Sequence, residues 1–218
     1  MKTAIIVFPE TNCDVETFRA CELLGWAPEY VTSTAEALDG FDMVILPAAS
    51  SSLEFIQTAR LAVYTPIIEA IKHFVDKKQG IVMGICIGFQ ILCEIGLLPG
   101  SIEKNDSAKY ICDDVELILS EHGVQRRVVL PIACLEGKYV VNAKGLNKLN
   151  EEGMIFLTYI KNPNGSVGDI AGIIDKNKNI IGLIPCPEKA VSKEFGFDRG
   201  RLIFSIAECL YNDLKGKR

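Results

Sequence analysis

Residues 80–100 read GIVMGICIGFQILCEIGLLPG and decide the fold. The apolar run Gly80 to Ile85 is typical of a strand that is covered on both faces, and Gly88 to Leu97 has the pattern of a helix. The whole stretch is apolar enough to raise a membrane span, but it holds Gln90 and Glu94 and is interrupted by glycines. We therefore interpret it as a buried strand that runs into a helix.

The same alternation of strand and helix extends through the first half of the chain. Strand-like runs occur at Thr3 to Phe8 and Asp42 to Leu46, and helical spacing occurs at Asp14 to Leu24 and Pro66 to Val75. Strands that alternate with helices predict an α/β fold: a doubly wound, mainly parallel sheet with helices on both faces.

The second half is richer in short strands. Five segments are predicted as strands: Val115 to Leu119, Val128 to Ala133, Met154 to Tyr159, Asp169 to Ile174 and Ile180 to Ile184. Turn signals separate them, which favours a short antiparallel extension of the sheet. Arg201 to Leu214 is predicted as an amphipathic closing helix. Because no repeat or linker divides the chain, we expect residues 1–218 to form a single domain.

Composition excludes several classes of protein. Of 218 residues, 49% are hydrophobic, and the formal net charge is −5. This acidic balance argues against a nucleic-acid partner, and the basic run Gln125-Arg126-Arg127 is too short to overturn it. Because the first residues lack a secretory signal, we expect a cytoplasmic protein with no membrane partner. The eight cysteines contain no C-x-x-C pair, and we interpret most of them as buried thiols.

The strongest chemical signal is Gly84-Ile85-Cys86-Ile87-Gly88. It places a cysteine between two glycines where the strand meets the helix, as in a nucleophile elbow with sulfur in place of oxygen. The helix N-terminus would favour a thiolate and offer backbone N–H groups to an oxyanion. The alternative is an ordinary buried cysteine at a strand–helix junction, which the flanking glycines disfavour.

A cysteine nucleophile that acts on an amide usually needs a base, and the chain has two histidines, His73 and His122. Neither is well placed. His73 lies in a helical pattern, where a solvated face is expected, and His122 lies in the turn Glu121-His122-Gly123. No set of histidines, cysteines and carboxylates has the spacing of metal ligands, so we expect no metal.

Many segments, in order along the chain, carry a resemblance to a known family. They include Ile6-Val7-Phe8-Pro9, Asn12-Cys13-Asp14, Gly84-Ile85-Cys86, Gly88-Phe89-Gln90-Ile91-Leu92, Gly96-Leu97-Leu98-Pro99-Gly100, Leu130-Pro131-Ile132-Ala133, Pro163-Asn164-Gly165-Ser166 and Gly182-Leu183-Ile184-Pro185. In these segments the chain resembles the glutaminase subunits of phosphoribosylformylglycinamidine synthase, which are class I glutamine amidotransferases of purine biosynthesis.

The resemblance implies a flavodoxin-like fold and a subunit that hydrolyses glutamine and passes ammonia to a larger synthetase chain. Many members of the family have a small third subunit as well. We expect no cofactor in this chain. ATP and magnesium would bind the synthetase partner, since this chain has no G-x-x-x-x-G-K-[ST] motif.

The resemblance also assigns the catalytic positions and makes Cys86 the nucleophile. The family's base is a histidine followed by proline and glutamate, whereas this chain reads Cys186-Pro187-Glu188. A thiol with an ordinary pKa of about 8.5 cannot stabilise a neighbouring thiolate as an imidazolium does, so we predict weak hydrolysis. Without the resemblance, Glu188 would be interpreted as a surface carboxylate paired with a nearby lysine.

The family's oxyanion site is altered too. After Leu46-Pro47 the family has a Gly-Gly pair, where this chain has Ala48-Ala49 and then Ser50 to Gln57. A Cβ at a position that needs positive φ would cost roughly 1–2 kcal/mol. The oxyanion and substrate-binding positions would be Ala48, Ala49, Ile87, Gly88 and Gln90. Two smaller departures are Ile87, where the family usually has asparagine, and Cys134-Leu135, where it has histidine then glycine.

Three hypotheses remain open. The chain is a glutaminase subunit with reduced activity, a non-catalytic structural or regulatory subunit of a synthetase that uses free ammonia, or a cysteine-elbow hydrolase or thiol sensor. The resemblance favours the first two, and glutamine turnover with and without the synthetase separates them.

Overall fold

The computed structural model describes residues 1–8, 11–49, 59, 61–121, 123–193 and 198–216. The strands of its large sheet are β1 (Lys2–Val7), β2 (Ala27–Thr32), β3 (Met43–Leu46), β4 (Ile81–Ile85), β6 (Ile111–Glu121), β7 (Val124–Cys134), β9 (Ile155–Tyr159), β10 (Ile170–Ile174) and β11 (Ile180–Leu183). A second sheet contains β5 (Ser101–Lys104) and β8 (Glu136–Val140). The helices are α1 (Asp14–Leu23), α3 (Ile67–Asp76), α4 (Ile87–Glu94), α5 (Ala143–Glu151) and α6 (Gly200–Gly216), with short 3₁₀ turns η1 (Val167–Asp169) and η2 (Pro187–Lys189).

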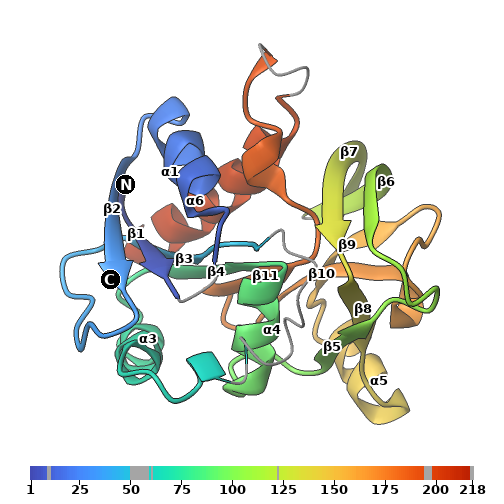
Figure 1. Ribbon diagram of the computed structural model, residues 1–218, viewed down its shortest axis with the longest axis horizontal. Coiled ribbons are helices and arrows are strands. Elements are labelled where there is room, and N and C mark those ends of the chain that lie inside the picture. Colours follow the sequence, from blue (N-terminus) through green and yellow to red (C-terminus); the bar gives the residue numbers. More distant parts are fainter. Residues whose placement is uncertain (9–10, 50–58, 60, 122, 194–197, 217–218) are drawn as a thin grey trace.

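The predicted doubly wound arrangement is confirmed in the first half of the sheet. The nine described strands lie in the order β2-β1-β3-β4-β11-β10-β9-β6-β7, and β2, β1, β3, β4 and β11 pair in parallel. Helices α1 and α6 cover one face, and α3 and α4 cover the other (Figure 1). Every residue of β3 and β4 is buried, as expected for uniformly apolar strands between two helical layers.

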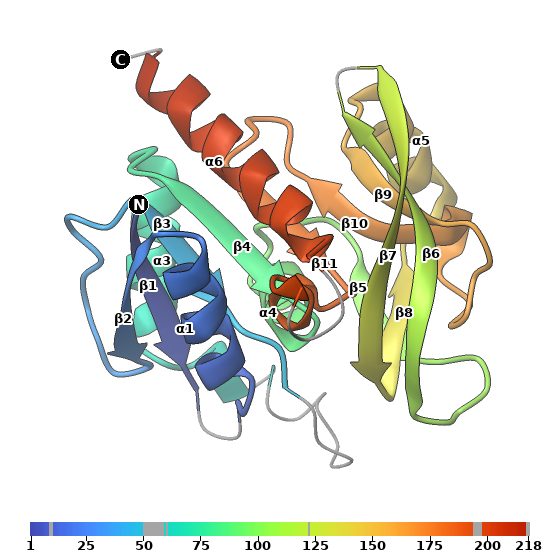
Figure 2. The same cartoon turned by 90° about the horizontal axis from the view of Figure 1, so that it is seen from above.

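The predicted antiparallel extension is also confirmed. Strands β11, β10, β9, β6 and β7 pair with their neighbours in antiparallel fashion. β6 and β7 form a long hairpin at the end of the sheet (Figure 2). α6 crosses one face of the sheet and packs against β4. β11 therefore belongs to both the parallel and the antiparallel part of the sheet, because it forms a hairpin with β10 and pairs in parallel with β4. This places the end of β11 beside the end of β4.

Four helices and strands were not predicted from the sequence: β2, β5, β8 and α5. Weak burial explains why most of them were missed. β2 lies at the edge of the sheet, and none of its six residues is buried. α5 buries only Leu149. In α1 the predicted helix is confirmed, and it packs through Thr17, Ala20 and Cys21, while Val15 and Leu23 are exposed. Among the described residues, no helix is long and apolar enough to cross a membrane.

The glycines of the elbow allow α4 to pack directly on the sheet. A Cβ at Gly84 would lie 2.5 Å from the backbone of Gly88, and a Cβ at Gly88 would overlap the carbonyl group of Leu46 in β3. Such backbone atoms cannot rotate away as a side chain could. The close strand–helix contact that the sequence predicts therefore depends on the absence of these two side chains.

Gly88→Ala should destabilise the fold by about 1–3 kcal/mol, because the added methyl group forces α4 away from β3. Urea unfolding measures the change. Gly216→Ala is the matched control, since its Cβ would meet nothing within 4 Å at the end of α6, and we expect little change there. Equal stability of Gly88→Ala and the parent chain would contradict this close packing.

Candidate active site

Cys86 lies at the turn between β4 and α4, as the sequence predicts. Its φ is 52° and its ψ is −104°, a conformation that non-glycine residues adopt at a cost of order 1–3 kcal/mol. Its N–H donates to the carbonyl of Leu183 in β11 over 2.8 Å, which fixes the turn to the neighbouring strand. Strain of this kind is typical of an elbow that presents its side chain at the end of a sheet.

The first turn of α4 surrounds this thiol. The backbone N–H of Ile87 acts to lower the pKa of Cys86, although the thiol accepts no capping hydrogen bond from α4. The backbone N–H of Gln90 donates to the Cys86 carbonyl over 3.1 Å. The Gln90 side chain is buried, and its Nε2 has no hydrogen-bond partner. Ile87 thus acts on the thiol through its backbone N–H, and the expectation that its side chain matters little stays a prediction.

η2 carries Cys186 and Glu188 to the same end of the sheet. The N–H of Cys186 donates to the carbonyl of Pro131 in β7 over 2.8 Å, and the N–H of Lys189 donates to the carbonyl of Cys186 over 3.2 Å. η2 packs against both α1 and α6. Cys186 and Glu188 are 1% and 3% exposed. The structure therefore brings Cys86, Cys186 and Glu188 together, and it excludes the alternative of a surface carboxylate.

Burial dominates the electrostatics of Glu188 and raises its pKa from 4.5 to about 7. Its own backbone N–H, Lys189 and the Cys186 thiol each act to lower the pKa. Both carboxylate oxygens are buried, however, and neither accepts a hydrogen bond in the structure. Near neutral pH this carboxyl group is thus divided between its protonated and ionised forms.

Cys134, at the end of β7, is the residue whose place in the site the sequence did not reveal. The Cys134 side chain interacts with Cys86 and is the largest cause that raises the pKa of Cys86 well above its ordinary value. Burial and the charges of Cys134 and Glu188 act in the same direction. The signal was present in the resemblance, since Cys134 stands at a position where the family has histidine.

Burial also raises the pKa of Cys186 well above its ordinary value, and the charges of Glu188 and Cys86 add to the effect. Lys189 acts in the opposite direction. Two buried thiols and a partly protonated carboxyl group therefore occupy the site at neutral pH. The Cys186 thiol is thus not a ready proton acceptor for Cys86, and weak hydrolysis stays a prediction.

The oxyanion segment is only partly described. Ala48 and Ala49 are each 1% exposed, and the N–H of Cys13 donates to the Ala48 carbonyl over 3.3 Å. Neither alanine is among the described residues with positive φ. Neither alanine therefore bears the cost that a Cβ would have at a position with positive φ. The rest of the segment, residues 50–57, lies outside the described residues.

Comparison with known proteins identifies the family. Residues 1–196 match the CobB/CobQ-like glutamine amidotransferase domain. The chain belongs to this family. The phosphoribosylformylglycinamidine synthase subunit PurQ of Prochlorococcus marinus is 38% identical over 205 residues, which cover 90% of this chain and 94% of that protein.

Solved structures give the same family and fold for this glutamine amidotransferase domain. In the structure of PurLQS from Thermotoga maritima, the matching chain is 31% identical with a TM-score of 0.83, and 94% of this chain and 96% of that chain are covered. A glutamine amidotransferase from Thermotoga maritima has a TM-score of 0.57 at 15% identity over 99% of this chain and 94% of that chain. The second likeness shows the fold alone, which is the flavodoxin-like class I arrangement that the resemblance implied.

The other predictions about this amidotransferase domain can now be compared with its structure. His73 is exposed on α3, as predicted, and His122 lies outside the described residues. Of the eight cysteines, all of them free, five are buried: Cys13, Cys21, Cys86, Cys134 and Cys186. In the described part of the chain, no group of three or more histidines, cysteines and carboxylates could hold a metal ion.

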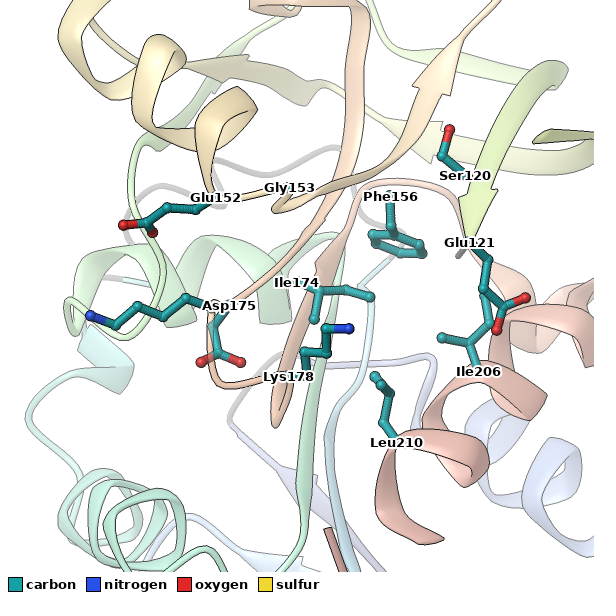
Figure 3. Close-up of a pocket in the computed structure, with 11 residues that line it drawn as sticks. Ser120, Glu121, Glu152, Gly153, Phe156, Ile174, Asp175, Lys178, Ile206 and Leu210 are labelled. Atoms are coloured by element: carbon teal, nitrogen blue, oxygen red, sulfur yellow. The ribbon is translucent and has the colours of Figure 1, made fainter. Parts of the chain in front are cut away.

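A separate pocket lies at the opposite end of β11, where the β10–β11 turn approaches α6 (Figure 3). Its volume is about 150 Å³, and it is lined in part by Phe156, Ile174 and Leu210. The carboxylate of Asp175 already accepts the backbone N–H groups of Asn177, Asn179 and Ile180 and so stabilises the turn. The described residues that line this pocket include no cysteine, so Cys86 and its neighbours remain the candidate active site of the amidotransferase domain.

Alkylation of Cys86 by iodoacetamide should be slow at neutral pH and should keep accelerating up to at least about pH 9, because the pKa of this thiol is raised. Mass spectrometry of the Cys86 peptide after timed labelling measures the rate at each pH. The exposed thiol of Cys209 in the same digest provides the internal reference. A Cys86 rate that reaches a plateau near pH 7 would contradict the environment described.

Proposed function

We propose that this chain is the glutaminase subunit of phosphoribosylformylglycinamidine synthase and supplies ammonia from glutamine to the synthetase chain. The observation that carries the proposal is the strained elbow at Cys86 in a chain that is 38% identical to a PurQ subunit over nearly its full length. The similarity to a chain of PurLQS supports assembly with a synthetase and with a small third subunit. The sheet and hydrophobic core run through both halves of the chain, which supports one domain over residues 1–218.

In the proposed reaction, Cys86 attacks the side-chain amide carbon of glutamine and releases ammonia, and water then hydrolyses the thioester to glutamate. The Ile87 N–H acts to lower the pKa of Cys86 and so favours the thiolate. Ala48, Ala49, Gly88 and Gln90 occupy the positions proposed for substrate and oxyanion binding.

Proton transfer is the weak point of this site. The attacking thiol must lose a proton, and the leaving ammonia must gain one. Cys186 occupies the position of the base, but its pKa is raised by burial and by Glu188. The pKa of Glu188 itself is about 7, but the side chain contacts Cys186. We therefore propose that the chain hydrolyses glutamine slowly, and that Glu188 acts through Cys186 as a positioning residue.

The test is reconstitution with the synthetase chain of the same organism. We expect a stable complex by size-exclusion chromatography, and we expect product formation in that complex with ammonium chloride as nitrogen donor. Cys86→Ala should leave both results unchanged, because it removes the nucleophile but not the fold. Failure of the parent chain to bind the synthetase would contradict the proposed function.

A second candidate, a non-catalytic subunit, is favoured by the buried, protonated state of the thiols at neutral pH. A subunit of this kind would form the same complex with the synthetase, so glutamate release is the measurement that separates the two candidates. A non-catalytic subunit releases no glutamate above the rate of Cys86→Ala, whereas a slow glutaminase does.

A further inference from the structure

The segment that carries Cys186 and Glu188 is held between two helices. η2 packs against both α1 and α6, which cover the same face of the sheet (Figure 1). Before η2, the segment is anchored to the sheet, because the Cys186 N–H donates to the carbonyl of Pro131 in β7 over 2.8 Å. After η2, the first two residues of α6 supply the contacts.

Gly200, the first residue of α6, lies directly against this segment. Its N–H donates to the carbonyl of Ala190 over 2.7 Å. A Cβ at Gly200 would overlap the carbonyl oxygen of Pro187, the first residue of η2. No side chain fits between the two backbones, so the start of α6 is in direct contact with η2. The next residue, Arg201, is therefore placed beside the chain that leaves η2.

The Arg201 guanidinium joins two segments that are far apart in the sequence. Its Nε donates to the carbonyl of Val191, just after η2, over 2.7 Å. Its Nη2 donates to the carbonyl of Leu23, at the end of α1, over 3.1 Å. Because a planar guanidinium holds its donors in a fixed geometry, both carbonyls are fixed relative to α6 and to each other. We call this pair of hydrogen bonds the Arg201 bridge.

A pocket of about 260 Å³ lies between α1 and η2, and its lining includes Leu23, Val191 and Glu188. Although Glu188 lines the pocket, both of its carboxylate oxygens are buried and accept no hydrogen bond. A polar pocket of this size can hold water, which would hydrate the carboxyl group if it reached those oxygens. The Arg201 bridge binds the carbonyls of Leu23 and Val191, so it fixes two walls of this pocket.

We propose that Arg201 is a positioning residue of the site, which holds η2 against α1 and thereby excludes water from the carboxyl group of Glu188. The inference rests on the function proposed above, in which Glu188 acts through Cys186. It assigns to the site a residue of α6 that the proposed reaction does not otherwise use. Without the Arg201 bridge, η2 is free to move away from α1, and water from the pocket reaches the carboxyl group.

Hydration of Glu188 has a definite effect on its titration. Burial is the largest cause that raises the pKa of Glu188 to about 7, so water at the carboxyl group should lower this pKa. Loss of the positive charge of Arg201 would by itself raise the pKa, so the two effects have opposite signs. The other ionisable groups at the elements around Glu188 are Glu16 and Arg19 of α1, Lys189 of η2, and the thiols of Cys86, Cys134 and Cys186.

The experiment follows the side-chain carboxyl carbon of Glu188 by NMR while the folded, full chain is titrated with pH. Loss of the signal in Glu188→Gln identifies it. We expect a midpoint near the pKa of about 7 in the parent chain. In Arg201→Lys the midpoint should fall by roughly one pH unit, because lysine keeps the charge but lacks the planar fork that binds both carbonyls. Arg199→Ala is the matched control, since it removes the neighbouring positive charge and leaves the Arg201 bridge in place.

An unchanged midpoint in Arg201→Lys would overturn the proposal, even if urea unfolds this variant more easily, because lower stability alone does not move a titration within the folded chain. A midpoint that rises in Arg201→Ala would show that Arg201 acts through its charge and would overturn the proposal as well. The titration needs neither glutamine nor the synthetase. Failure of the chain to bind the synthetase, which contradicts the proposed function, is therefore a separate result.

Discussion

Replacing Cys186 with histidine should raise glutamine hydrolysis in the synthetase complex by roughly 100-fold, near the lower end of what a positioned general base contributes. An imidazole at this position can accept the proton of Cys86 and return it to the departing ammonia. Glu188 is already in place to orient the ring, since it contacts Cys186. The gain is limited because the Cys134 side chain raises the pKa of Cys86, and because Ala48-Ala49 replaces the family's Gly-Gly pair.

Cys186→Ser is the matched control for Cys186→His, because serine has a similar size and supplies no base. We expect no gain in hydrolysis from it. The double variant Cys186→His with Glu188→Gln should lose part of the gain and shift the pH profile, since an amide does not stabilise an imidazolium. Glutamate release is measured for each complex. If Cys186→His folds, labels faster at Cys86 and still gives the parent rate, proton transfer does not limit this site.

Glu188→Gln should remove a large pH dependence of stability. The pKa of Glu188 is about 7 in the folded chain and near its ordinary 4.5 when unfolded, so the folded state binds more protons between these values. The stability that this group contributes is fully present below pH 4.5 and is lost as the pH rises through about 7. Burying the ionised group at higher pH then costs about 3 kcal/mol. Glutamine carries no charge and escapes this cost.

Urea unfolding of parent and variant at roughly pH 5 and pH 8 tests the linkage. Relative to the parent, Glu188→Gln should be about 3 kcal/mol more stable at the higher pH than at the lower one. Glu208→Gln, on the exposed face of α6, is the matched control and should show no such difference. If the free energies of unfolding of the parent and of Glu188→Gln change with pH in the same way, Glu188 is ionised at both pH values.

Much of the fold was predictable because its central strands have a simple pattern. β3 and β4 are apolar at every position since helices cover both faces, and that pattern is visible in the sequence. β2 and α5 were missed because they bury little. β5 and β8 pair only with each other, and in such a small sheet the strands lack a long apolar run. Local patterns thus predicted the covered part of the sheet and missed its edges.

The candidate site was predictable where one segment contains the signal. Gly84 and Gly88 mark the elbow because both must lack a side chain there. The contact between Cys86 and Cys134 joins residues 48 positions apart, on β4 and β7, and no local pattern encodes it. The φ values of Ala48 and Ala49 could not be predicted for a similar reason, since the φ of a loop depends on its surroundings.

Glutamate release by the reconstituted complex tests the central claim most directly. The parent chain, Cys86→Ala and Cys186→His are each assayed with glutamine in the presence of the synthetase chain and its ATP and magnesium. A slow rate in the parent that disappears in Cys86→Ala and rises in Cys186→His is the predicted result. A parent rate ordinary for an enzyme, about 10 per second, or an equal rate in Cys86→Ala, would contradict the account.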